Sequence, residues 1–476
     1  MFNKRLYIGL GAVCITLAAS SCKTPTLIER TENRRVPVSF NAGSDSVNTG
    51  AFRWAEFFTD PNLVALIDTA LHNNQELNIT QQEIQIAQNE VQARAGEYKP
   101  FVGLRAGAGV DKVGEYTRFG ALERSTDVRP GREFPNPLPD FLVAAEVSWQ
   151  VDIWNKLRNA KRSAAARYLA SVEGRNFTVT NLVSEIANSY YELLALDSQL
   201  DILKRNIDIQ TNALNIVRLE KESARVTELA VRRFEAQVLR TQSMQYDIQQ
   251  RITETENRIN FLVGRFPQPV VRSTGDFGAL VPQVVSAGLP AQILQNRPDI
   301  RQAERELEAA QLDVQVARAN FLPSLNLSAA VGFNSYNPAL LLSPQSLLFS
   351  LMGGLTRPLI NKNAITALYY SSNSRQTQAV YSYERTVLNA YVEVANQLAS
   401  IQNLQKSYDL KSRQVQALIQ STNISNTLFK SARADYMEVL LTQRDALESR
   451  FDLVETKMQQ LHAVVNAYRA LGGGWR

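Results

Sequence analysis

The chain contains an internal duplication, and this feature constrains its fold more than any other. Five short segments of the first half recur in the second half after 201 to 223 residues. Such a period is too long for a solenoid, whose repeats span roughly 20–50 residues, so it predicts two similar half-domains. The matched pairs are Glu97–Leu104 with Asn320–Leu327, Ile153–Lys156 with Leu359–Lys362, Asn188–Glu192 with Asn389–Glu393, Ser223–Arg225 with Ser431–Arg433, and Leu262–Gly264 with Leu471–Gly473.

The first 21 residues predict a bacterial lipoprotein signal peptide. Lys4 and Arg5 form a charged region, residues 6–19 are mostly apolar, and small residues precede Cys22. The apolar stretch is shorter than the roughly 20 residues that a membrane-spanning helix needs. Cys22 is therefore predicted to carry lipid, the alternative being ordinary signal cleavage beside an unrelated cysteine. The only other cysteine, Cys14, lies inside the signal, which leaves no partner for a disulfide.

The residue patterns do not indicate an enzyme. The sequence shows no phosphate-binding glycine loop, no nucleophile elbow and no Cys/His ligand spacing. Its two histidines, His72 and His462, lie far apart and are interpreted as ordinary surface or packing residues. We therefore predict no cofactor and no metal. The net charge of +5 does not indicate nucleic-acid binding, which needs lysines and arginines clustered on one face.

Two proline-free runs predict long helices. No proline occurs between Pro139 and Pro267 or after Pro358, and both runs are rich in helix-forming residues. Apolar side chains recur at helical spacing from Leu182 to Ile207. Breaks near 224–227 and 432–435 divide each run, so we predict two antiparallel helical hairpins. An extended coiled-coil protein of the cell envelope is the alternative.

Period-two patterns precede both runs and predict strands with one apolar and one polar face. They are clearest in 143–152 and 324–333 and weaker in 101–110 and 345–356. Each stretch has about 10 residues, the length of a tilted transmembrane strand. The first strand-pair segment exceeds the second by 17 residues, which we assign to its outer loop. The face predicted to line a lumen carries Glu146, Ser148, Gln150, Ser324, Asn326 and Ser328, and the face predicted to meet lipid carries Trp149, Leu325, Leu327 and Phe333.

Four strands are too few to close a barrel. In lipid an open edge leaves unpaired backbone groups that cost several kcal/mol each, so the edges must pair with other chains. Two chains give eight strands and a barrel filled by side chains, whereas three give twelve and room for water. We therefore predict a homotrimer in outer-membrane lipid, with the helices continuing as a hollow tube.

Several motifs between residue 36 and the C-terminus occur together. They are Trp54, Asp60-Pro61 and Asn73-Asn74; Arg297-Pro298-Asp299-Ile300-Arg301 leading to Phe321-Leu322-Pro323; and Tyr436-Met437-Glu438 with Gln443-Arg444. In this combination the chain resembles the outer-membrane efflux family, the TolC-like outer-membrane factors, and most closely their lipoprotein branch typified by OprM.

The resemblance implies a mixed α+β, duplicated TolC-like fold in the outer membrane, with a trimeric twelve-stranded barrel and a periplasmic helical tunnel. It implies a passive channel that exports drugs or other small toxic compounds, together with a periplasmic adaptor (a membrane fusion protein) and an inner-membrane pump of the resistance-nodulation-division (RND) class. The conduit of a type I protein secretion system is the alternative. The predicted division is a signal peptide at 1–21, a lipid-anchored extension at 22–60, a first repeat at 61–266 (strand pair 101–152, hairpin 155–264), a linker at 267–290 and a second repeat at 291–476 (strand pair 323–358, hairpin 361–471).

The resemblance also implies a periplasmic gate at the helical breaks. In the family, acidic residues just after the second break constrict the pore, and Glu438 is the matching position here. We predict that Arg433, Asp435 and Glu438 of one tip contact Arg225 and Glu228 of the adjacent tip. Asp435 and Glu438 also have the spacing of a capping box, in which each side chain bonds the other residue's amide.

Overall fold

The computed structural model describes residues 24–27, 30–37, 39–40, 48–431 and 433–476. Its element order confirms the predicted plan, because in each half a helix is followed by a strand, a loop, a strand and two long helices. The chain forms two compact units, one containing Ile86–Tyr168 and Arg305–Val380 and the other containing Leu169–Glu304 and Tyr381–Arg476. Each unit therefore draws on both halves of the duplication.

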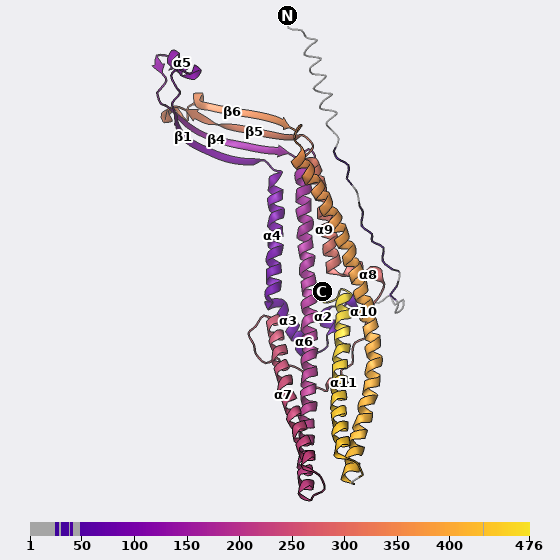
Figure 1. Cartoon of the computed structure of the whole chain (residues 1–476). Helices are drawn as coiled ribbons and strands as arrows, with labels where there is room; N and C mark the ends of the chain where they lie inside the picture. Colours follow the sequence, from indigo (N-terminus) through magenta and orange to yellow (C-terminus); the bar gives the residue numbers. More distant parts are fainter. Residues whose placement is uncertain (1–23, 28–29, 38, 41–47, 432) are drawn as a thin grey trace. The chain divides into compact units, whose positions relative to one another are not determined.

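The first unit contains a four-stranded antiparallel sheet in the order β1-β4-β5-β6 (Figure 1). The connection between β1 and β4 is the longer one and holds a helix and a small hairpin, which accounts for the excess length of the first strand-pair segment. The elements are β1 (Phe101–Asp111), α5 (Arg118–Ser125), β2 (Asp127–Arg129), β3 (Arg132–Glu133), β4 (Leu138–Val151), β5 (Ser324–Ser335) and β6 (Leu347–Thr356).

Two pairs of long helices follow the strands, as the proline-free runs predict. α6 (Lys156–Glu222) and α7 (Glu228–Val263) form one hairpin, and α10 (Asn363–Lys430) and α11 (Tyr436–Ala470) form the other (Figure 1). The remaining elements are η1 (Thr49–Ala51), α2 (Trp54–Phe57), α3 (Pro61–Asn73), α4 (Gln75–Glu97), η2 (Phe277–Ala279), α8 (Pro290–Asn296), α9 (Pro298–Ala319), η3 (Pro338–Leu340) and η4 (Pro344–Ser346). In the described part of the chain, no helix combines the length and apolar content needed to cross a bilayer.

The duplication extends to backbone conformation. Asn155 and Asn361, which precede α6 and α10, have φ angles of 57° and 54°. Asparagine tolerates this left-handed region better than most residues, so the same turn opens both long helices. Both hairpins also end alike, since Gly264 and Gly472 have φ angles of 77° and 88°. The structure therefore matches Gly264 with Gly472, whereas the sequence pattern pairs Gly264 with Gly473.

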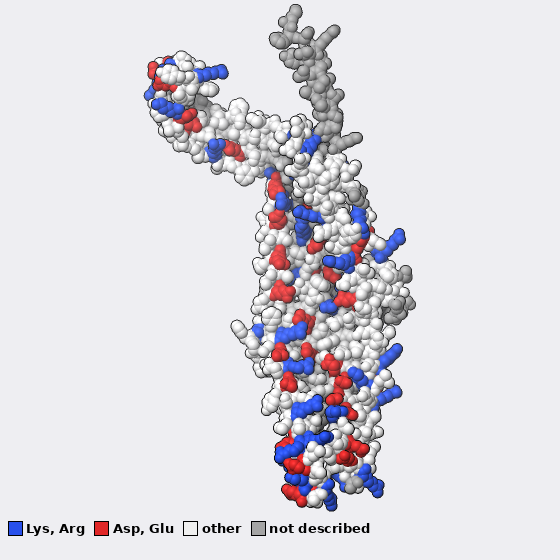
Figure 2. All heavy atoms as spheres, viewed as in Figure 1, with Lys and Arg blue, Asp and Glu red and all other residues white. Residues whose placement is uncertain are grey.

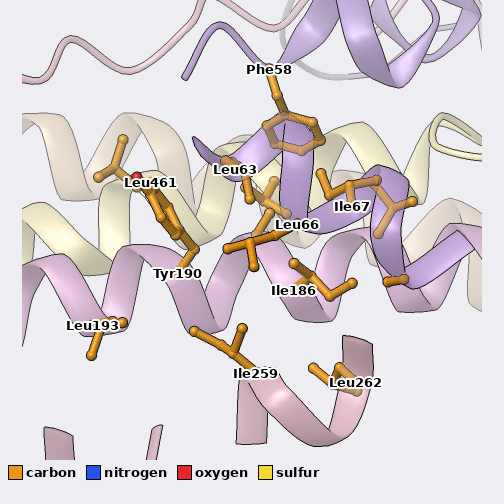
Figure 3. Close-up of a cluster of buried hydrophobic side chains, with 14 of the residues drawn as sticks. Phe58, Leu63, Leu66, Ile67, Ile186, Tyr190, Leu193, Ile259, Leu262 and Leu461 are labelled. Carbon is orange, nitrogen blue, oxygen red and sulfur yellow. The ribbon is translucent and has the colours of Figure 1, made fainter. Parts of the chain in front are cut away.

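The core of the second unit lies where α3, α6, α7 and α11 meet (Figure 3). The helical spacing on α6 correctly indicates its buried face, because Ile186, Tyr190 and Leu193 are fully buried. The Tyr190 hydroxyl donates to an Asp60 carboxylate oxygen at 2.8 Å and accepts from the Ser273 amide at 3.2 Å. Burial, opposed by that amide bond, raises the pKa of Tyr190. Tyr190 thus joins the N-terminal segment, α6 and the linker.

The partly buried His462 predicts a pH dependence of stability. Its Nε2 lies 3.0 Å from the Asn188 carbonyl oxygen, and burial lowers its pKa although that bond and the carboxylates of Glu192 and Glu455 oppose the shift. Below about pH 6.5 the unfolded chain binds a proton that the folded chain resists. Stability is therefore present above that pH and is lost as the pH falls. We expect the melting temperature to fall from pH 7 to pH 5, and His462→Gln to reduce that fall.

The chain offers a matched control, because its other histidine, His72, is exposed. His72→Gln should keep the pH dependence of the parent. Equal pH profiles for the parent and His462→Gln would contradict this account.

Candidate functional site

The strand register places the predicted lumen-lining residues on one face of the sheet. Ser148 lies opposite Ser328 and Gln150 lies opposite Asn326 in the pairing of β4 with β5. Directly paired residues share a face and alternate residues along a strand return to it, so Glu146 and Ser324 belong to the same face. Whether this polar face lines a lumen stays a prediction.

Arg105 belongs to the same polar face and was not identified from the sequence. It lies opposite Ala144 on β4, and its Nη1 is 3.4 Å from a carboxylate oxygen of Glu146. The weak alternation of β1 concealed this position, since β1 carries glycine at 103, 107 and 109. The pair is exposed, so it is worth under about 1 kcal/mol.

The opposite face of the sheet is apolar and exposed. Trp149 lies opposite Leu327 and Val143 opposite Phe333, which unites the residues predicted to meet lipid. The edge strands extend this face, where Leu104 is 89% exposed and Phe349 is 82% exposed. A contiguous apolar face of this kind indicates a binding partner or a membrane.

Both edges of the sheet are open within one chain. β1 pairs only with β4 and β6 pairs only with β5 among the described strands. Each outer edge therefore presents a row of backbone amides and carbonyls without strand partners.

The tip of the first hairpin is held by ion pairs. Glu228 lies 2.5 Å from Lys221 and 2.8 Å from Arg232, which also bonds Glu235 at 2.9 Å. The Lys221 ammonium, helped by Arg232, lowers the pKa of the Glu228 carboxyl. Charges of both signs gather over this end of α6 and α7 (Figure 2). Ala224 makes the turn at a φ of 56°, a region that alanine rarely adopts.

The tip of the second hairpin contains Asp435 and Glu438, and their predicted capping box does not form. Asp435 is the N-cap of α11, but its side chain makes no capping hydrogen bond. The Glu438 amide donates instead to the Asp435 carbonyl oxygen at 3.1 Å, so the backbone satisfies this donor. In the described part of one chain, no ion pair joins Arg433, Asp435 or Glu438 to Arg225 or Glu228.

An apolar cluster, which the sequence did not reveal, joins the two tips. Phe429, Tyr436 and Leu440 of the second hairpin pack against buried residues of the first, including Val231 and Phe234. The spacing of Tyr436 and Leu440 could have predicted this contact, because residues four apart share a helix face.

Cys22 lies outside the described residues, so its lipidation stays a prediction. Within the described ranges, no group of three or more histidine, cysteine, aspartate or glutamate side chains could hold a metal ion.

The two-faced sheet with open edges and the paired long helices are typical of a membrane channel protein. The chain belongs to the outer membrane efflux protein family, whose model matches residues 66–265 and 289–473. It is therefore an outer-membrane channel of efflux systems, with a TolC-like fold, and not an enzyme.

Individual relatives agree with this assignment. The pyoverdine export outer membrane protein OpmQ of Pseudomonas aeruginosa is 27% identical over 425 residues, covering 89% of this chain and 88% of OpmQ. The solvent efflux pump outer membrane protein SrpC of Pseudomonas putida is 26% identical over 431 residues, covering 90% of this chain and 89% of SrpC. A crystal structure of CusC superimposes with a TM-score of 0.82 at 23% identity, covering 94% of this chain and 99% of CusC.

The two sheet faces give a labelling prediction. Asn326→Cys should react with a membrane-impermeant maleimide in intact outer membranes, and Leu327→Cys should not, because adjacent residues point to opposite faces. Gln150→Cys, directly opposite Asn326, should react like Asn326→Cys. The parent protein measures background labelling. Reaction of Leu327→Cys alone would reverse the assignment of the faces.

Proposed function

We propose that this protein is a passive, trimeric outer-membrane conduit that exports drugs or other small toxic compounds. The observation that carries the proposal is the sheet itself, which has one apolar face, one polar face and two unpaired edges. If β1 of one chain pairs with β6 of the next, the backbone groups on both open edges find strand partners. Three chains then supply twelve strands, enough for a water-filled barrel, whereas eight would be filled by side chains.

The helices are proposed to form a periplasmic tunnel in continuation of the barrel. Export through a passive tube needs an energy source elsewhere, which we assign to an inner-membrane pump of the RND class reached through a periplasmic adaptor. The names of OpmQ and SrpC, a pyoverdine exporter and a solvent efflux component, support small molecules as cargo. No feature of the chain favours protein secretion over this cargo.

Lipidation of Cys22 is also part of the proposal and rests on the signal sequence. The anchor would hold the N-terminal extension, 22–60, at the membrane. The two efflux repeats, 61–266 and 291–476, would then each supply one strand pair and one hairpin to the trimer.

The gate is proposed to lie at the hairpin tips. Arg433, Asp435 and Glu438 carry no ion pair within the described part of one chain, so they are available to the tip of an adjacent chain. Arg225 is the matching basic residue there. Glu228 could join only by leaving Lys221 or Arg232, so we place it at the rim of the latch. Each exposed pair contributes under about 1 kcal/mol, and threefold symmetry repeats it.

A deletion strain tests the cargo. Loss of the protein should lower the minimum inhibitory concentrations of several small toxic compounds, because their exit route is removed. The parent gene on a plasmid should restore resistance. Unchanged sensitivity together with retention of a normally secreted protein would instead show the type I secretion function.

The latch is tested by single-channel recording. Arg433→Ala combined with Glu438→Ala should raise the conductance of the trimer in planar bilayers, because the tips lose their ionic contacts. Arg444→Ala with Asp445→Ala removes a pair of the same charges from α11, 3.0 Å apart, and should leave conductance unchanged. Equal conductance in all three proteins would refute the latch but not the channel.

A further inference from the structure

A cavity of about 1040 Å³ in the second unit is bordered by segment 270–280 and by α6, α10 and α11. Segment 270–280 is firmly fixed, because Arg272 lies 2.5 Å from both Asp197 and Glu256. The Ser273 amide adds its bond to the Tyr190 hydroxyl. The cavity is therefore formed by a segment held in place and not by a loose loop.

Lys457 lies in the wall of this cavity with most of its side chain buried. Its side chain belongs to a residue that is only 6% exposed, and its Nζ lies 4.9 Å from the centroid of the Tyr408 ring. Among the described residues, neither a carboxylate nor a hydrogen-bond acceptor pairs with its ammonium. Burial lowers the pKa of Lys457. The aromatic face stabilises the ammonium only in part, so an anion in the cavity would stabilise it further.

None of the described acidic residues of the wall forms an ion pair with Lys457. Asp197 is bonded to Arg272, and an oxygen of Asp276 accepts from the Gly278 amide at 3.0 Å. Asp201 is the remaining acidic residue of the lining, in which basic residues outnumber acidic ones. The basic residues lining the cavity besides Arg272 are Lys204, Arg205, Arg450 and Lys457.

We propose that this cavity binds a small organic anion whose carboxylate or phosphate oxygens accept hydrogen bonds from the Lys457 ammonium. The wall also offers apolar surface for the body of such a ligand, at Leu194, Leu453 and Val454. A bound anion would connect segment 270–280 with α11. The site goes beyond the proposed function and does not depend on which compounds pass through the channel.

The test uses the purified full-length channel in detergent, titrated separately with sodium benzoate and with inorganic phosphate against sodium chloride of equal ionic strength. At least one of the two should raise the melting temperature and give a saturable calorimetric signal. Benzoate alone indicates a carboxylate site with apolar contacts, and phosphate alone indicates a phosphate site. Lys457→Met should weaken binding at least about tenfold, because a hydrogen bond to a charged group is lost.

Lys411→Met is the matched control, because Lys411 does not line the cavity and its ammonium bonds the Thr456 hydroxyl at 2.9 Å. It should bind the anion as the parent does. Absence of binding to the parent, or equal binding by Lys457→Met, overturns the proposal. A lower melting temperature of Lys457→Met without any anion response in the parent also overturns it, because Lys457 would then have a carboxylate partner in the assembled channel.

Discussion

Backbone hydrogen bonding at the sheet edges is the constraint on which the rest of the structure depends. One chain supplies four strands, and β1 and β6 each lack a partner on the outer side. In the outer membrane such edges cannot be solvated, so the strands of one chain are incomplete alone. The duplication supplies these strands from one repeated unit, since each repeat contributes one strand pair. Pairing β1 with β6 of a neighbouring chain needs no new type of contact, only another antiparallel ladder.

The two repeats also differ at their tips, where equivalent hairpins are stabilised by different interactions. Ion pairs among Lys221, Glu228 and Arg232 hold the first tip. Near the second tip, Ser425 and Thr442 contact through their hydroxyl groups at 2.9 Å. Exposed ion pairs weaken with salt, whereas the apolar cluster that joins the tips does not. The position of the tips within one chain is therefore set by packing, which leaves the remaining charges free to act between chains.

The sequence predicts those features that local pattern determines. Period two predicted the strands, proline-free runs predicted the long helices, and alternation alone grouped Gln150 with Asn326, which the register confirms. The features that the sequence did not predict depend on a backbone group or on a segment distant in sequence. The Glu438 amide, which was predicted to bond the Asp435 side chain, donates to the Asp435 carbonyl oxygen. The cavity around Lys457 depends on segment 270–280, which is far from Lys457 in the sequence. A periodic residue pattern cannot predict that two such distant segments lie close together.

The motif Arg297-Pro298-Asp299-Ile300-Arg301 has a structural role. Arg297 is only 5% exposed, and its guanidinium bonds Asp299 at 2.8 Å, Glu393 at 2.8 Å and the Ala470 carbonyl oxygen at 2.8 Å. Removing one partner of such a network leaves a buried charge, at a cost of about 3–5 kcal/mol. The motif therefore fastens the start of the second repeat to α10 and to the end of α11. Residues that would act on the cargo must be sought elsewhere, on the polar strand face and at the tips.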